Sequence, residues 1–226
     1  MSDENLYSTV KKLYVDSVYV VYGLSGLGCI ALFVMMWKRG WNRMLVFLLI
    51  FMLGYAVGMI VWAATWRVNL YVYVSGYTLS MMASAACHWT ITETYLKTAH
   101  YAKVILGLKS AKDPKELLSK AESFTRRLKF ARYAVVTLIL VLGALLFIGY
   151  EEFFNFRGGE LLFYYTDYSF GAFCICCMLV WAWTLYKLYN EVSQIKNLLP
   201  SKNFFRLHVS LLALYLVLEV AATISD

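Results

Sequence analysis

Charged residues are scarce in this chain. They make up 15% of its 226 residues, while hydrophobic residues make up 61%. A soluble domain has about 25% charged and roughly half apolar residues. A chain of this size with so little charge cannot cover a soluble core. The shortage of charge therefore excludes an ordinary soluble domain and indicates a membrane protein.

Proline is also rare, with 2 residues, and neither falls inside a long apolar run. Several of these runs reach the roughly 20 residues that a helix needs to cross the hydrocarbon layer. They are too long and too continuous for the alternating strands of a membrane barrel. We therefore predict an all-α fold, a polytopic bundle of transmembrane helices.

Other absences narrow the function. The chain has no Asn-x-Ser/Thr sequon, and its 5 cysteines all fall inside apolar runs, so a disulfide-bonded secreted fold is not indicated. No predicted span contains lysine, which excludes the anchor of a retinal Schiff base. The acids and histidines that a membrane hydrolase or hydroxylase needs on facing helices are missing. We expect no enzyme activity.

Metal and cofactor sites have little support in the sequence. Cys87, His88, Cys174 and Cys177 could lie at a similar depth, and such side chains bind zinc or copper. Their spacing is that of ordinary helices, however, and free cysteine is a common buried residue. With only 3 histidines, haem is equally weakly supported. We expect no metal and no cofactor.

Six spans are predicted in a single membrane domain that covers residues 1–226, at about 15–37, 44–66, 70–95, 133–150, 161–186 and 207–224. The third span continues as one long helix into a cytosolic helical hairpin at about 96–132. Asp113 and Pro114 suit the N-cap and first position of its second helix. That helix carries an apolar seam, which we expect to pack against the third helix: Leu117, Ala121, Phe124, Leu128 and Ala131.

The basic residues set the expected orientation. Of the 21 Lys and Arg, 17 fall in the first, third and fifth connections between spans. The positive-inside rule places these connections in the cytosol, so both termini are predicted to be extracytoplasmic. The same rule explains the net charge of +7 without nucleic acid. We expect membrane lipid as a partner, and the basic hairpin from Lys97 to Arg132 is a candidate surface for a protein partner.

One face of the third span changes from small to polar along its length. Gly76, Ser80, Ser84, His88 and Thr92 recur every four residues and so share a helix face, which we expect to point into the bundle. In the second span, Gly54 and Gly58 form a small-xxx-small pattern typical of close helix contacts. Gly54, Gly58, Gly76 and Ser80 are therefore predicted helix-packing residues.

Acids inside spans are the candidate functional groups. Glu219 in the sixth span would cost a few kcal/mol on insertion scales, which favours a ligand, ion or proton site. A protonated carboxyl bonded to a neighbouring side chain is the alternative. His88 and Glu93 lie towards the inner end of the third span, and Ser84 and Thr92, which lie nearby, are candidates as well. The alternative for His88 and Glu93 is that they are a pair of buried polar groups that bridge helices.

Three functions remain open. A receptor- or sensor-like bundle is favoured by the expected outer N-terminus, the polar face of the third helix, an aromatic outer loop at 151–160 and the basic inner face. A non-catalytic accessory or scaffold subunit of a larger membrane complex fits the compact chain and its small-residue faces. A channel or transporter, lined by Glu219 and the third helix, lacks an internal repeat.

Overall fold

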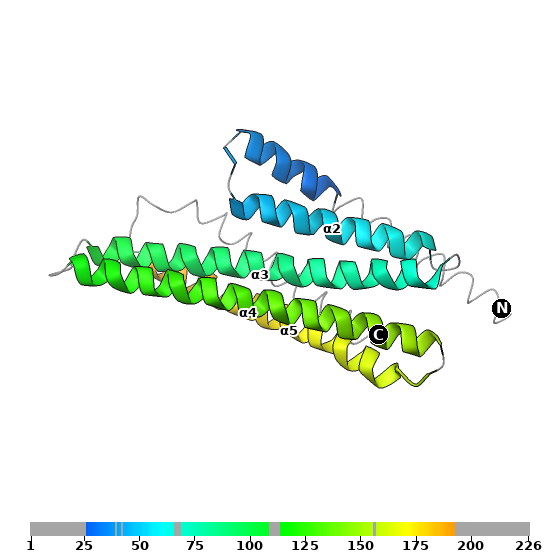
Figure 1. The fold of residues 1–226 in the computed structure, drawn as a ribbon. Helices are drawn as coiled ribbons and strands as arrows, with labels where there is room; N and C mark the ends of the chain where they lie inside the picture. The colour runs from blue at the N-terminus through cyan, green and yellow to red at the C-terminus, as the bar shows by residue number, and fades with distance from the viewer. Residues whose placement is uncertain are drawn as a thin grey trace, which may run out of the picture. The chain divides into compact units, whose positions relative to one another are not determined.

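The computed structural model describes residues 26–38, 40–41, 43–65, 69–108, 114–155 and 157–192. All regular secondary structure in these residues is α-helical. It consists of the helix Gly26–Lys38 followed by α2 (Arg43–Thr65), α3 (Leu70–Leu108), α4 (Pro114–Phe154) and α5 (Glu160–Val192) (Figure 1). The all-α prediction is confirmed for this part of the chain.

Some predictions lie outside the described residues. They concern residues 15–25 of the first span, the sixth span at 207–224 with its Glu219, and both termini. Nothing in the structure bears on Glu219 as a candidate site.

Three described helices are long and apolar enough to cross a membrane. Their apolar segments are Leu45–Trp62 in α2, Ser119–Phe153 in α4 and Glu160–Leu188 in α5. The helix Gly26–Lys38 is apolar but shorter, and α3 is not among the three, since polar residues interrupt its second half. The structure thus supports a helical bundle suited to a membrane, but it does not support the full set of six spans.

The observed helix boundaries follow local sequence signals. α3 runs for 39 residues without a break, as predicted for the long third helix, because no proline interrupts it. α4 begins at Pro114, where a fixed φ suits the first turn and no amide hydrogen is needed. The outer loop was predicted too long: residues 151–154 are helical, and α4 ends only at Phe154. Their apolar and acidic side chains carry no helix breaker, which appears only at Gly158 and Gly159.

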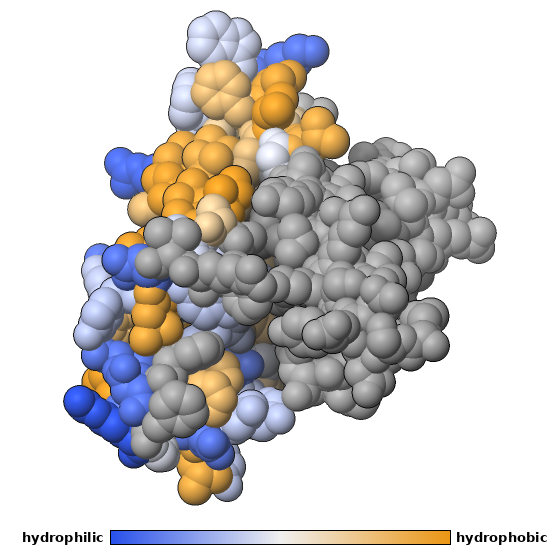
Figure 2. Space-filling view, turned by 90° about the vertical axis from the view of Figure 1, so that its right-hand side faces the viewer, coloured by the Kyte–Doolittle hydropathy of each residue, from blue (hydrophilic) through white to orange (hydrophobic). Residues whose placement is uncertain are grey.

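The chain divides into two compact units. Of the described residues, unit 1 contains those up to Cys87 together with Leu140–Asp167, and unit 2 contains those from His88 to Ile139 together with those from Tyr168 to Val192. Each unit therefore includes a part of α3, α4 and α5. Both expose large apolar side chains, among them Ile50, Val57, Val136, Leu138 and Leu179. Figure 2 shows hydrophobic residues at the surface of the described part of the molecule. Exposed apolar side chains of this number suit contact with lipid.

In unit 1, α2 and α3 approach each other through glycines. A Cβ atom on Gly58 would lie 2.8 Å from the carbonyl oxygen of Gly76 and from the amide nitrogen of Ser80. A Cβ on Gly76 would lie 2.7 Å from the carbonyl oxygen of Gly58 and from the amide nitrogen of Trp62. Gly54 lies one turn away, where an added Cβ would only touch Ala83 at 3.5 Å. We call the mutual approach of Gly58 and Gly76 the glycine contact.

Aromatic rings from four helices pack together in unit 1. The rings belong to Trp62 of α2, Tyr73 and Tyr77 of α3, Tyr150 of α4 and Phe163 of α5, with neighbouring centroids 4.6–6.2 Å apart. This is the normal distance range of favourable ring pairs. We call these five residues the aromatic cluster.

The tyrosine hydroxyls of the aromatic cluster are hydrogen-bonded. The hydroxyl of Tyr77 donates to Oδ1 of Asp167 at 2.8 Å, and the hydroxyl of Tyr150 donates to that of Tyr73 at 3.0 Å. These bonds link α3 to α5 and α3 to α4. Within unit 1 they give the tyrosine hydroxyls the hydrogen-bond partners that they need when they are withdrawn from water.

A five-residue connection joins α4 to α5 in unit 1. Gly158 has a φ of 85°, a conformation that side chains with a Cβ rarely adopt. Gly159 is buried, and a Cβ there would lie 2.6 Å from the carbonyl oxygen of Gly149. A Cβ on Gly149 would in turn lie 2.8 Å from the amide nitrogen of Phe163. The glycines therefore let α4 and α5 turn back on each other at close range.

In unit 2, α3 and α4 form the two sides of the hairpin that the sequence predicted. The rings of His100 and Phe124 stack with centroids 4.0 Å apart. Ala121 and Leu128 of the predicted seam are buried, and Phe124 is half-buried. α5 packs against the same part of α3, since Tyr95 and Trp181 lie 5.0 Å apart between ring centroids.

Candidate functional site

Among the described residues of unit 2, the most deeply buried charged one is Glu93 of α3, which is 1% exposed. Its position in the predicted third span made it a candidate from the sequence. A bare carboxylate at such a place is costly, and it must be paired and hydrogen-bonded to be tolerated. Its partners therefore define what this part of the molecule can do.

Two cations hold both oxygens of the Glu93 carboxylate. Nε of Arg132 donates to Oε2 at 2.9 Å, and Nη2 of the same guanidinium donates to Oε1. Nζ of Lys97 lies 2.8 Å from Oε1. Arg132 belongs to α4, whereas Lys97 lies one helical turn after Glu93 on α3. We call these three residues the charge cluster.

The geometry of the charge cluster fixes how α4 lies against α3, in addition to stabilising their contact. A guanidinium that donates two bonds to one carboxylate fixes both planes, so α4 is held at one rotation and height against α3. The carboxylate is buried, but the side chains of Lys97 and Arg132 are 26% and 37% exposed. The cluster is therefore reached by solvent or headgroups from its cationic side only, and it carries one net positive charge.

The preceding residue, Thr92, links α3 to α5. Its hydroxyl lies 2.8 Å from the carbonyl oxygen of His88 and 3.3 Å from that of Cys177. A hydroxyl has one proton, so the shorter bond within α3 is the main one and the contact to α5 is its weaker branch. Adjacent residues of α3 thus contact two different helices: Thr92 contacts α5 and Glu93 contacts α4.

The remaining predicted positions on this face of α3 differ in burial. His88 is 7% exposed and Ser80 is fully buried, while Ser84 is half-buried. Ser80 donates from its hydroxyl to the carbonyl oxygen of Tyr77 at 2.7 Å. Ser80 and Ser84 belong to unit 1, and His88 belongs to unit 2. Thr92 and the backbone of His88 are therefore hydrogen-bonded to each other in the turn of α3 that precedes Glu93, and Ser80 lies at the glycine contact.

Two members of the charge cluster were not predicted as site residues. Lys97 and Arg132 entered the sequence analysis only as the ends of the basic hairpin. The spacing of Glu93 and Lys97, four residues on a helix, is a sequence signal for an ion pair. Arg132 is also traceable, because Glu93 lies at about the same distance before the end of α3 as Arg132 lies after the start of α4, and the two therefore meet in an antiparallel hairpin.

The chemistry open to this cluster is limited by its occupied atoms. Both carboxylate oxygens already accept bonds from cations, so Glu93 is not poised as a general base. In the part of the chain that the structure describes, no three His, Cys, Asp or Glu side chains gather in a way that could hold a metal ion. The cysteines are free thiols. The arrangement can hold helices together or release them, and it can attract an anion.

Comparisons with models of known protein families, with curated proteins and with solved structures found no match to this chain.

Proposed function

We propose that this chain is a multi-pass integral membrane protein with a receptor- or sensor-like helix bundle, in which the charge cluster is the element that changes state. The proposal includes the six spans, a cytosolic location for the basic hairpin and extracytoplasmic termini. It includes no catalytic role. Support for the membrane setting comes from the three helices that are long and apolar enough to span.

The observation that carries the proposal is the pairing of the buried Glu93 carboxylate with the partly exposed guanidinium of Arg132. An ion pair withdrawn from water is seldom worth more than apolar packing of the same volume. Its better-attested use is to specify one arrangement over another, and ionisable residues inside membrane helices most often have a function. Here the pair links two helices, and its cations are accessible from one side. A ligand or partner that competes for Arg132 would free α4 from α3.

Spin labels on the hairpin test this proposal. Thr98 on α3 and Arg127 on α4 are both exposed, both lie in unit 2, and neither belongs to the charge cluster. Distances between labels at these positions would be measured in nanodiscs for the otherwise unchanged protein and for Glu93→Gln. We expect the unchanged protein to show one main distance and the Glu93→Gln variant to show a second, discrete one.

The control variant is Glu116→Gln. Glu116 forms an ion pair with Lys120 at 2.6 Å, also over four residues, but both side chains are largely exposed. This variant should leave the distance distribution unchanged. A broad, unresolved distribution in Glu93→Gln, or an unaltered one, would show that the charge cluster only supports the fold.

An accessory or scaffold subunit is the alternative, and the exposed apolar side chains of α2 favour it. Phe47, Ile50, Leu53, Val57 and Ile60 are each about half exposed, on the helix that also carries the glycine contact. Such a surface suits a second membrane protein as well as lipid. Purification in mild detergent separates the two: a stable monomer favours the sensor, and a chain that stays intact only within a larger complex favours the subunit. A channel or transporter gains no support from the described residues.

A further inference from the structure

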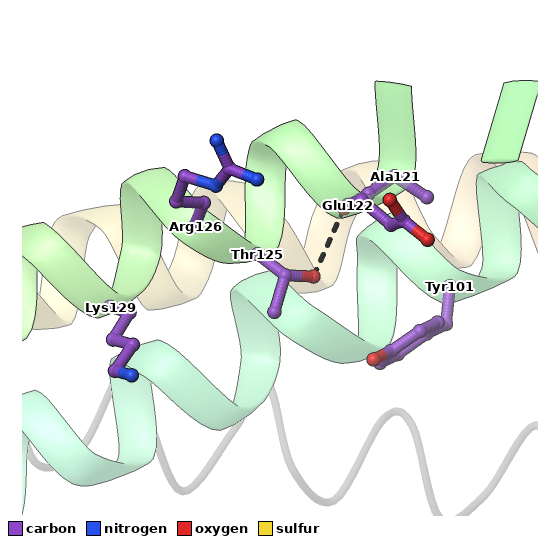
Figure 3. A pocket seen from close by; sticks show the side chains of 6 residues that line it. All are labelled: Tyr101, Ala121, Glu122, Thr125, Arg126 and Lys129. Atoms are coloured by element: carbon purple, nitrogen blue, oxygen red, sulfur yellow. Dashed lines mark hydrogen bonds between the residues drawn. The ribbon is translucent and has the colours of Figure 1, made fainter. Parts of the chain in front are cut away.

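A groove lies between α3 and α4 in unit 2, with a volume of about 510 Å³. Tyr101 of α3 lines it on one side, and α4 supplies Ala121, Glu122, Thr125, Arg126 and Lys129 (Figure 3). Lys129 lies at one end of the groove, Tyr101 and Glu122 lie at the other, and Thr125 lies between them. None of these residues belongs to the charge cluster.

The position of the groove along α4 relates it to a membrane surface. Arg132 is the last charged residue of α4 before an apolar stretch from 133 to 150. Just before and after it, the aromatic rings of Phe130 and Tyr133 are 77% and 61% exposed. Exposed aromatic rings beside basic residues at the end of an apolar stretch are typical of the headgroup layer. The groove begins at this level.

One face of α4 changes in character along its length. Glu122, Arg126, Lys129, Tyr133 and Val136 follow one another at spacings of four and three residues, so they lie along one face of the helix. The order is acid, two cations, an exposed aromatic ring and an exposed aliphatic chain. This order matches a phospholipid read from its headgroup to its acyl chains.

We infer that the groove between Tyr101 and the Glu122–Lys129 segment of α4 binds the headgroup of an anionic phospholipid. Arg126 and Lys129 contact the phosphate, and the acyl chains run past Tyr133 along the apolar part of α4. The hydroxyl of Thr125 already donates to the carbonyl oxygen of Ala121 at 3.0 Å, so its oxygen is free to accept a bond from the headgroup. A soluble anion would gain the two cations but not the apolar face.

Glu122 makes the site selective. Its carboxylate repels a second negative charge at its end of the groove, and it accepts hydrogen bonds from hydroxyl or ammonium groups. The site should therefore favour a headgroup with a phosphate and a hydrogen-bond donor, such as phosphatidylglycerol, over one with only anionic groups. This inference is independent of the proposed sensor role, since it uses different residues and needs no conformational change.

The test uses the full chain in nanodiscs of phosphatidylcholine with a minor fraction of spin-labelled phosphatidylglycerol or spin-labelled phosphatidylcholine. The measured quantity is the preference of the protein for the anionic label. An electrostatic contact of one Lys or Arg at the surface is worth roughly a fivefold preference. We expect Arg126→Gln and Lys129→Gln each to lower the preference by about this factor.

Arg127→Gln is the matched control. Arg127 is exposed on the same helix, next to Arg126, but it does not line the groove. Arg127→Gln removes the same charge at nearly the same position along α4. A preference for the anionic lipid that depends only on overall charge would therefore fall equally in Arg126→Gln and Arg127→Gln. That result would overturn the inference. An unchanged melting temperature in all three variants would show that the differences are not due to unfolding.

Inorganic phosphate distinguishes a lipid from a free anion. If the groove takes lipid, added phosphate should lower the preference for phosphatidylglycerol only by general screening, equally in the unchanged protein and in Arg127→Gln. Specific displacement, abolished by Arg126→Gln, would identify the groove as a site for a soluble phosphate compound instead and would refute the lipid as its occupant.

Discussion

The two units fix α3 by different chemistry. In unit 1, α3 meets α2 through the glycine contact, and the aromatic cluster surrounds it with rings. In unit 2, α3 meets α4 through the charge cluster. Packing contacts fall off steeply with distance and tolerate no added volume. Charged contacts reach further, but they fail when one partner loses its charge. The contacts of α3 thus depend on close packing in its first part and on charge pairing in its second part.

The largest effect is expected from a substitution that disrupts the charge cluster. Arg132→Met keeps most of the side-chain volume but leaves Glu93 with Lys97 as its remaining cation. Because the buried carboxylate loses both hydrogen bonds from the guanidinium, we expect a loss of about 3 kcal/mol in the free energy of unfolding. Titration with a denaturing detergent in mixed micelles measures this loss. Arg127→Met, at an exposed position on the same helix, should change stability little.

The double variant Glu93→Gln with Arg132→Met sharpens this result. It removes the buried negative charge together with its main partner, so it should be less damaging than Arg132→Met alone. Additive losses would mean that the two side chains contribute independently, contrary to the geometry of the charge cluster.

The next largest effect is expected from substitutions that disrupt the glycine contact. Gly58→Ala and Gly76→Ala each place a methyl group within 2.8 Å of backbone atoms of the facing helix. The helices must separate, and we expect each variant to lose about 2 kcal/mol. The same titration measures it. Gly171→Ala serves as the control, because nothing lies within 4 Å of a Cβ there; equal losses in all three would refute the close approach.

A smaller effect concerns the polar ends of the aromatic cluster. Tyr77→Phe keeps the ring but removes the hydrogen bond to Asp167. Side-chain bonds between membrane helices contribute about 1 kcal/mol, and we expect a loss of this size. Tyr71→Phe removes a hydroxyl from an exposed ring of the same helix and should have no effect. Unequal losses in the two variants would locate the contribution in the bond rather than in the hydroxyl itself.

The smallest effect is a dependence on pH in the hairpin. Burial lowers the pKa of His100 below its ordinary value of 6.5, and the nearby charge of Lys103 lowers it further. The folded protein therefore binds fewer protons than the unfolded chain between the lowered pKa and 6.5. Stability rises with pH through this window and is lost as pH falls below about 6.5.

The variant His100→Phe isolates this contribution. It retains an aromatic ring for the stack on Phe124 but cannot titrate. As the pH falls from neutral to mildly acidic, the melting temperature of the unchanged protein should fall relative to that of the variant. A difference that is constant with pH would show that protonation of His100 does not affect the hairpin.

Much of the helical framework was predictable because its signals are local. Apolar runs without proline indicated α2, α3 and α5, and Pro114 marked the first residue of α4. The prediction of a loop at residues 151–154 is wrong for a physical reason: it rests on acidic and aromatic residues, and nothing in these residues breaks a helix. α4 instead ends at Phe154, before the connection in which Gly158 adopts a positive φ.

The candidate site was predictable only in part, since its contacts are not local. Glu93 stood out because an acid inside a predicted span is rare, and Lys97 was within reach through its spacing. Arg132 required the register in which α3 and α4 pair, and this register is not a local feature of the sequence. The contact of Tyr77 with Asp167 joins residues 90 positions apart and had no signal in the sequence. Six spans could be predicted from hydropathy, but the described residues support three.

The separations of these contacts along the chain bear on the order in which the protein assembles. Glu93 and Arg132 are 39 residues apart, Tyr73 and Tyr150 are 77 apart, and Tyr77 and Asp167 are 90 apart. As the chain leaves the ribosome, the shorter loops can close first, and nearby contacts carry the smaller entropy of closure. The salt-bridged hairpin can therefore form while α5 is still being synthesised. Tyr77 finds its partner on α5 only afterwards, so a fault in α5 would leave an intermediate in which the charges are already paired.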